Sequence, residues 1–476
     1  MTSAAPTPPS ARSFTVRYLT LFGGEAVSKL CVMAAFAYLA HVLTPGEYGT
    51  VELALSITLF FVLSVESGMG LYGASQLAAA PARLSTLVPQ VMVLRLLLGA
   101  PLFALLLAVA WRFAPAFLGI LSVNGLAVLL TPFLVQWVFQ GLRQMQWVAA
   151  GSALRNLTFV ALVLLLVGPG ADIRLAAVAE VGGITALAVF NLVVLRTRIH
   201  ASLDWRGSVA GARQLFSRIW FMGFGDLTWA CIWYGPAVVL RWMDLPDEVA
   251  WITASVRVVV ALHTFVWLYF FNLLPNLSKE LATGVDAWRR LVSRSLGAAL
   301  WPALLIAVAG SLGAPVVMPL VFGSGYAAAI LPAQIAVWMI PITWYSGHFR
   351  FSLIAAGRQR NEVVISAISA VAGVAGALVL GRTHGGVGAA AALAGAGVLN
   401  ALLATLAASR LIGAVGVGAN AIPVVVVTIV SLAIGFATTS AAGALAGAAA
   451  GCVVFAVAAV RYNNELVRTL GGLVTR

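Results

Sequence analysis

Residues 86–111 read TLVPQVMVLRLLLGAPLFALLLAVAW, an apolar stretch in which Arg95 is the only charged side chain. About 20 helical residues cross the hydrocarbon core of a bilayer, so this stretch is long enough to span it. Comparable stretches recur along almost the whole chain. The sequence therefore predicts an all-α polytopic membrane protein with about 14 transmembrane helices.

The composition supports the membrane class. The chain is 62% hydrophobic and 9% charged, with a mean hydropathy of +1.01, whereas soluble domains carry about 25% charged residues. Because the connecting loops are short, neighbouring helices are expected to run antiparallel in a bundle. The predicted spans lie near residues 16–43, 48–73, 86–111, 117–140, 147–168, 174–195, 215–241, 249–274, 289–312, 331–355, 361–381, 386–409, 415–437 and 440–460.

Basic residues gather in alternate loops, most densely between residues 196 and 218. This alternation is typical of the positive-inside rule and predicts a protein of the bacterial cytoplasmic (inner) membrane with both termini in the cytoplasm. The net charge of +13 is therefore attributed to topology and to attraction between the protein and anionic membrane lipids. It does not imply that nucleic acid is a partner.

A weak internal repeat appears at an offset of about 200 residues. Gly24-Glu25 corresponds to Gly225-Asp226, and Pro45 with Glu47 corresponds to Pro246 with Glu248. Parallel repeats of this kind predict two bundles of similar orientation with a substrate site between them. The expected organisation is a disordered tail, two six-helix bundles in a pseudo-twofold arrangement, and an additional two-helix hairpin with a cytoplasmic tail, over residues 1–15, 16–200, 201–410 and 411–476.

Charged side chains at membrane depth are the first candidates for function, because they are costly in lipid and usually face a bundle interior or a cavity. Glu25 and Lys29 are four residues apart, which allows either a self-neutralised helix pair or a cavity wall on which Lys29 meets an anionic substrate.

Arg95 and Arg257 have no opposite charge within a helical turn in sequence. Each must pair with another helix or bind an anion. Candidate structural partners are Glu66, Glu180 and Asp226, and the acidic groups at depth are numerous enough for complete pairing. Two further arginines, Arg155 and Arg350, are predicted near inner helix ends, where long side chains either reach the interface or, as further substrate-binding candidates, meet the substrate.

One predicted helix carries an acid and two indoles on a single face. Asp226, Trp229 and Trp233 recur at i, i+3 and i+7. Indole faces stack on sugar rings and attract cations, so this stripe suits a polar, carbohydrate-bearing substrate. Trp233 could equally belong to an interfacial aromatic belt. His263, in the next span, could carry a proton or simply be a hydrogen-bonded buried histidine.

Nothing in the sequence predicts a cofactor, a metal site or an enzyme. The three cysteines, Cys31, Cys231 and Cys452, are too scattered for metal binding or a disulfide framework. Phosphate loops, paired-histidine zinc motifs and nucleophile elbows are missing from the sequence.

Several motifs resemble those of the polysaccharide (lipid-linked oligosaccharide) flippases of the multidrug/oligosaccharidyl-lipid/polysaccharide (MOP) exporter superfamily. They are the hairpin Ala40-His41-Val42-Leu43-Thr44-Pro45-Gly46-Glu47-Tyr48-Gly49, then Glu66-Ser67-Gly68-Met69-Gly70, Leu320-Val321-Phe322-Gly323-Ser324-Gly325-Tyr326-Ala327 and Ala355-Ala356-Gly357-Arg358-Gln359-Arg360. The resemblance implies two six-helix bundles around a cavity that opens alternately to each side of the membrane. It also implies a lipid pyrophosphate-linked sugar as substrate.

Three functions follow as hypotheses. The first is a flippase for a polyprenyl-pyrophosphate-linked oligosaccharide, with Arg95, Arg257 and Lys29 on the pyrophosphate and Trp229 and Trp233 on sugars. The second is a proton- or sodium-coupled exporter of small cations, in which Glu25, Glu66 or Asp226 couples to the ion and His263 is a further candidate. The third is a membrane glycan polymerase or ligase. Polysaccharide polymerases and glycosyltransferases are the expected protein partners of a flippase.

Overall fold

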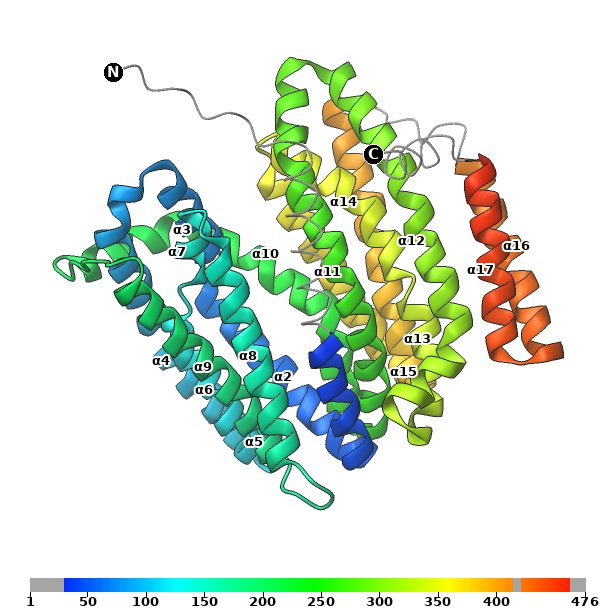
Figure 1. The fold of residues 1–476 in the computed structure, drawn as a ribbon, viewed down its shortest axis with the longest axis horizontal. Helices are drawn as coiled ribbons and strands as arrows, with labels where there is room; N and C mark the ends of the chain where they lie inside the picture. The colour runs from blue at the N-terminus through cyan, green and yellow to red at the C-terminus, as the bar shows by residue number, and fades with distance from the viewer. Residues whose placement is uncertain (1–29, 414–420, 463–476) are drawn as a thin grey trace. The chain divides into compact units, whose positions relative to one another are not determined.

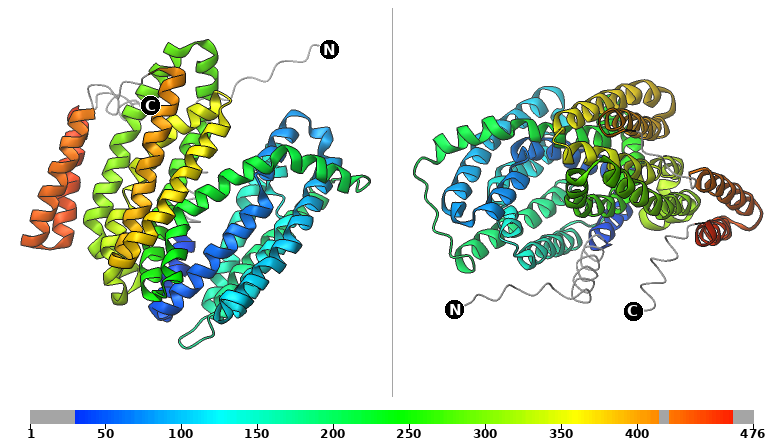
Figure 2. Two further views of the ribbon diagram at one scale, coloured as in Figure 1. Left: turned by 180° about the vertical axis from the view of Figure 1, so that it is seen from behind. Right: turned by 90° about the horizontal axis from the view of Figure 1, so that it is seen from above.

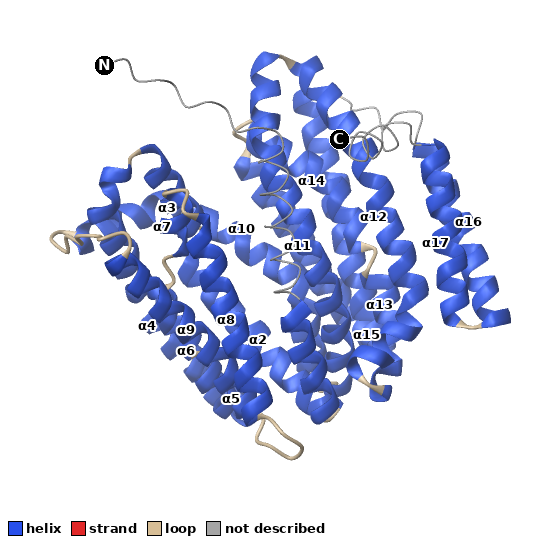
Figure 3. Cartoon of the chain, viewed as in Figure 1, coloured by secondary structure: helices blue, strands red, loops and turns tan. Residues whose placement is uncertain are grey.

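The computed structural model describes residues 30–413 and 421–462, and within these residues it contains helices but no strand (Figure 3). In this part of the chain, 11 helical segments are long and apolar enough to cross a membrane. The prediction of an all-α polytopic membrane protein is confirmed. Both predicted terminal tails lie wholly or largely outside the described residues.

The described helices coincide with the predicted apolar spans (Figure 1). For the span predicted at 16–43 only helix Leu30–Val42 is described. The two spans predicted at 361–381 and 386–409 are two helices within the segment labelled α15 (Gln359–Ile412), which reverses direction at Gly385. The two helices pack on each other, since a Cβ on Gly373 would lie 3.0 Å from the Cβ of Ala396. Gly385 has φ +52° and ψ −131°, a conformation that a residue with a Cβ rarely adopts.

The chain divides into two compact units. The first comprises the described residues up to Val42 together with Gly68–Ile219, and the second comprises Leu43–Ser67 and the described residues from Trp220 onward. Helix α2 (Pro45–Glu66) thus belongs to the second unit, although the predicted N-terminal bundle, 16–200, includes it. The predicted pseudo-twofold arrangement of the bundles stays a prediction.

The first unit combines helices that are neighbours in sequence with helices that lie far apart in the chain. Helix Leu30–Val42 packs on α8, since the rings of Phe36 and Phe159 are 5.5 Å apart and the Tyr38 hydroxyl donates to the Val167 carbonyl at 2.8 Å. The predicted span 117–140 is divided into short helices around Pro132. The helices are α3 (Met69–Ala79), η1 (Pro81–Arg83), α4 (Leu84–Phe113), η2 (Pro115–Phe117), α5 (Leu118–Asn124), α6 (Leu126–Leu130), η3 (Thr131–Phe133), α7 (Gln136–Gly141), α8 (Met145–Leu166) and α9 (Arg174–Thr197).

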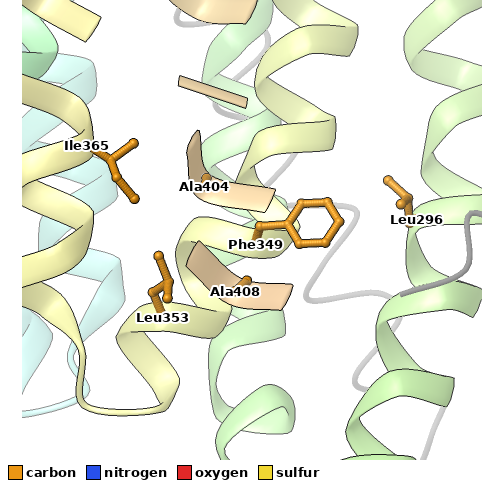
Figure 4. Close-up of a cluster of buried hydrophobic side chains, with 6 residues drawn as sticks. All are labelled: Leu296, Phe349, Leu353, Ile365, Ala404 and Ala408. Carbon is orange, nitrogen blue, oxygen red and sulfur yellow. The ribbon is translucent and has the colours of Figure 1, made fainter. Parts of the chain in front are cut away.

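The second unit surrounds α14 with long helices. Figure 4 shows one of its hydrophobic clusters, in which Phe349 and Leu353 of α14 meet Leu296 of α12 and Ile365 and Ala404 of α15. Besides α2 and α15, the unit contains the residues of α10 (Ser208–Trp242) from 220 on, α11 (Pro246–Thr283), α12 (Val285–Phe322), η4 (Ser324–Ala329), α13 (Ile330–Ala336), α14 (Met339–Ala355), α16 (Ala421–Ala442) and α17 (Ala444–Tyr462).

Helices α16 and α17 form the predicted additional hairpin, and the two helices lie side by side in both Figure 1 and Figure 2. Small residues account for their close contact, because a Cβ on Gly447 would lie 2.5 Å from the Gly435 carbonyl oxygen. Trp301 of α12 packs on Phe455 of α17 with ring centroids 5.6 Å apart. The hairpin therefore extends the second unit through α12.

The repeat-related prolines both begin helices, α2 at Pro45 and α11 at Pro246. Glu47 closes a capping box on its own helix, in which its carboxylate accepts from the Thr44 amide at 2.9 Å. Glu248 instead accepts from the amide of Gly386 at 2.6 Å and so caps the start of the second helix of α15. Gly24-Glu25 lies outside the described residues, and the repeat itself stays a prediction.

Candidate functional site

The predicted acid and indole stripe on α10 contributes to a cavity within the second unit. The rings of Trp229 and Trp233 have centroids 6.3 Å apart, and the ring of Trp233 is 4.9 Å from that of His263 on α11. Trp233 and His263 are buried. The stripe therefore places its indoles inside the unit, where Trp233 contacts a histidine of the neighbouring helix.

The cavity has a volume of about 30 Å³, room for about two water molecules at roughly 10–15 Å³ each. It brings together four of the predicted site residues, Trp229, Trp233, His263 and Arg350. Most of the remaining lining is uncharged and polar or small. These residues are Ile232, Met339, Thr343, Ser346, Ser366, Gly397 and Asn400.

The charge of Arg350 is neutralised at the cavity wall by Glu362 of α15. The Arg350 Nε donates to Glu362 Oε1 at 2.8 Å, and Nη2 of the same guanidinium also binds this oxygen. Ser366 donates to the same carboxylate oxygen at 3.1 Å, and the Asn400 amide nitrogen lies 3.5 Å from the Ser366 hydroxyl. The network presents polar atoms to the cavity but little net charge.

Two polar atoms of the cavity residues are buried and have no hydrogen-bond partner. They are the indole nitrogen of Trp229, a donor, and the amide oxygen of Asn400, an acceptor. A buried polar atom without a partner costs about 1–3 kcal/mol.

Arg257 pairs with an acid of α2 that the sequence reasoning did not single out. Its Nη2 binds Oε2 of Glu52, and the other oxygen of Glu52 accepts from the Tyr48 hydroxyl at 2.9 Å. The side chain of Glu52 is 3% exposed and that of Arg257 is 24% exposed. The sequence alone leaves the partner of Arg257 open among Glu66, Glu180 and Asp226, and the structure gives Glu52. Tyr48 comes from the family-like hairpin, so that motif holds the ion pair in place.

Arg95 lies fully buried in the first unit and supports a break in the neighbouring span. Its Nη1 donates to the carbonyls of Thr131 at 3.3 Å and Leu134 at 2.9 Å. These carbonyls follow Leu130, where α6 ends, and precede α7. The guanidinium thus satisfies backbone groups that the broken helix leaves without helical partners.

Of the other predicted residues, Arg155 forms an ion pair, Asp226 lies near two other acids, and two lie outside the described residues. Arg155 donates to Glu180 at 2.7 Å, with 40% of the arginine side chain exposed. Asp226 is close enough to Glu66 and Glu362 for their charges to act on it. Lys29 and Glu25, the predicted pair of the first span, lie outside the described residues.

One polar cluster has no counterpart in the sequence predictions. His348 accepts or donates at Nε2 with Ser295 at 3.0 Å and Tyr269 at 3.3 Å, while its Nδ1 donates to the Trp344 carbonyl at 2.8 Å. His348 is fully buried. Its surroundings come from three helices, so no local spacing in the sequence could predict them.

Within residues 30–413 and 421–462, no three His, Cys, Asp or Glu side chains come together as metal ligands. Cys31, Cys231 and Cys452 are free thiols.

Comparison with known proteins agrees with this architecture. Residues 18–280 match the family described as "Polysaccharide biosynthesis protein". A protein of Escherichia coli (strain K12) named "Putative O-antigen transporter" is 24% identical over 340 residues, which covers 67% of this chain and 78% of that protein.

Two solved structures share the fold. A multidrug resistance MATE family transporter of the MOP superfamily, in an inward-facing conformation, superposes with a TM-score of 0.71 at 12% identity, covering 81% of this chain and 94% of that chain. The lipid II flippase MurJ superposes with a TM-score of 0.70 at 10% identity, covering 95% of this chain and all (100%) of that chain. The resemblance to polysaccharide flippases of the MOP superfamily is confirmed. The chain is thus a multi-pass membrane protein that belongs to the polysaccharide biosynthesis protein family and has the fold of MOP superfamily transporters.

Proposed function

We propose that this protein is a transporter that moves a polyprenyl-pyrophosphate-linked oligosaccharide across the bacterial cytoplasmic membrane by alternating access. The family match and the name of the Escherichia coli relative support a role in polysaccharide export. The fold shared with a lipid II flippase is compatible with a lipid-linked substrate. The positive-inside pattern supports cytoplasmic termini.

The observation that carries the proposal is the cavity of the second unit. Two indoles, several hydroxyls and an amide line it, and its arginine is neutralised by Glu362. Indole faces and neutral hydrogen-bonding groups suit sugars, which are polar and uncharged over most of their surface. We therefore assign sugar contacts to Trp229 and Trp233, with His263 and Arg350 at the same wall.

The predicted arginines differ in the groups that already bind them. Arg95 donates to backbone carbonyls and Arg257 to Glu52, so we assign both to holding helices in place rather than to the pyrophosphate. Arg155 pairs with Glu180 and receives the same assignment. Lys29 remains the candidate contact for the pyrophosphate.

A strain that lacks this protein tests the proposal. We expect the strain to lose surface polysaccharide and to accumulate lipid-linked repeat units on the inner face of the membrane. Wild-type protein should restore export, whereas the Trp229→Ala, Trp233→Ala double variant should not, although it reaches the membrane. Lipid-linked units that accumulate on the outer face would instead indicate a polymerase or ligase, and normal surface polysaccharide would refute the proposal.

A second candidate function rests on the acidic groups near α10. Asp226 lies within electrostatic range of Glu66 and Glu362, and intramembrane acids can bind a proton or a sodium ion. An ion-coupled exporter of small cationic compounds would use Glu66 or Asp226 as the coupling acid. Hypersensitivity of the deletion strain to cationic drugs, with intact surface polysaccharide, would favour this function over the first.

A further inference from the structure

We propose that the first turns of α10, residues 208–219, lie at the cytoplasmic surface of the membrane and bind the headgroups of anionic phospholipids. The inference goes beyond the proposed function, because it concerns the lipid around the protein and not the transported substrate. It follows from the exposed face of this segment, from the arginines on and beside that face and from the length of the helix.

One face of the segment is anchored to the first unit. The residues that recur at i, i+4, i+7 and i+11 on this face are all buried; they are Ser208, Ala212, Leu215 and Ile219. In the preceding loop, the Asp204 amide donates to the Ser85 carbonyl at 2.9 Å. A Cβ on Gly211 would lie 2.5 Å from the side chain of Gln90 in α4. The segment therefore packs near the start of α4.

A second stripe, next to the buried one, is exposed and largely apolar. It repeats the same spacing one residue further along the chain and consists of Val209, Arg213, Phe216 and Trp220. The exposed fractions of Val209, Phe216 and Trp220 are 65%, 40% and 57%. Aromatic and aliphatic side chains on one face, with arginine among them, are typical of helices that lie in the interface between membrane and water.

The charge of this region is positive and is not neutralised by the protein. Between residues 196 and 218 the chain carries five arginines and one acid, Asp204. Arg206, Arg213 and Arg218 are exposed, and in the part of the chain that the structure describes no ion pair involves their guanidinium groups. An anionic surface is therefore the complementary partner.

The length of α10 favours the membrane surface over a soluble partner. Its 35 residues extend about 52 Å, whereas the hydrocarbon core is about 30 Å thick. The predicted span begins near residue 215, so the first turns of α10 lie at the cytoplasmic headgroups, where the positive-inside rule places their arginines. From Trp220 on, the same helix belongs to the second unit. Headgroups bound here would thus hold a helix that joins the two units.

The test measures amide hydrogen exchange of residues 208–219 in the purified full chain, reconstituted in nanodiscs. One set of discs contains phosphatidylcholine alone, and the other contains an equal mixture of phosphatidylcholine and the anionic phosphatidylglycerol. An arginine near an anionic surface contributes about 5-fold to binding, and local opening must first release the headgroups, so we expect exchange in the mixture to be at least about 10-fold slower. In about 1 M salt, where the screening length falls to about 3 Å, the exchange rates in the two sets should become equal.

Two variants separate the contributions of charge and apolar surface. Arg206→Gln, Arg213→Gln, Arg218→Gln removes three exposed charges and should exchange at the same rate in both sets of discs. Val209→Ser, Phe216→Ser removes apolar surface and should exchange about 3- to 10-fold faster than the wild type in both sets, while the difference between the sets remains.

The matched control removes the same number of charges elsewhere. Arg112→Gln, Arg174→Gln, Arg382→Gln replaces three exposed arginines of predicted outer loops and should keep the wild-type difference between the discs. Equal exchange of the wild-type segment in both sets at low salt would overturn the inference, and so would a control variant that loses the difference. Protection that requires added polyprenyl pyrophosphate or a soluble protein would assign the surface to another partner and also overturn the inference. None of these outcomes depends on transport, so the proposed function is tested separately.

Discussion

The ion pair between Glu52 and Arg257 allows a quantitative test of how the second unit is held together. Glu52→Gln keeps the shape of the side chain but removes its charge, so that Arg257 is left without this counter-charge. Removing one member of a buried ion pair costs about 3–5 kcal/mol. Because the Arg257 side chain is 24% exposed, we expect the lower end of this range, about 3 kcal/mol.

The assay is denaturant unfolding of the purified protein in detergent. The matched control is Glu180→Gln, whose partner Arg155 is 40% exposed and whose pair should contribute at most about 1 kcal/mol. The double variant Glu52→Gln, Arg257→Met should be more stable than Glu52→Gln alone, since the guanidinium is removed together with the charge of its partner. If Glu52→Gln and Glu180→Gln destabilise the protein equally, the ion pair does not stabilise the unit as argued.

Three further predictions follow from the described contacts. Arg95→Met should lower the free energy of unfolding by about 2–3 kcal/mol, since buried carbonyls lose a charged donor; equal thermal stability of variant and wild type would contradict this. Gly385→Ala should reduce the amount of folded protein in the membrane, because the new Cβ would lie 2.4 Å from the Glu248 carboxylate and the residue has φ +52°. An Ala variant that accumulates normally would refute the backbone conformation described at Gly385. Phe349→Ala should cost about 3–5 kcal/mol in denaturant unfolding, since the ring is 1% exposed in the cluster of Figure 4, and a loss below 1 kcal/mol would show that the site collapses.

The sequence alone was sufficient to predict the positions of the helices and some residues of the candidate site. The length of the apolar stretches predicted the spans, including the boundary near residue 385, because this signal is local. The stripe of Asp226, Trp229 and Trp233 could also be read locally, since positions i, i+3 and i+7 share a helix face whatever surrounds it. Their meeting with His263 and Arg350 is visible only in the structure.

The choice of charge partners could not be predicted. Glu52 and Arg257 are 205 residues apart, and nothing in either neighbourhood distinguishes Glu52 from the other acids at membrane depth. Glu362 follows Arg350 by 12 residues across a turn, and no helical spacing in the sequence pairs the two residues. Asn400 could not be predicted as a cavity residue, because its contact with Ser366 joins positions 34 residues apart.

The separation of 205 residues between Glu52 and Arg257 also affects how the protein is made. Helix α2 leaves the ribosome long before α11, so the Glu52 carboxylate enters the membrane without the guanidinium that later neutralises it. Until α11 is inserted, the insertion machinery, water or lipid headgroups must shelter this charge. A fragment ending at residue 219 would keep the acid permanently exposed to lipid, and the two halves of this chain should therefore insert stably only when they are synthesised together.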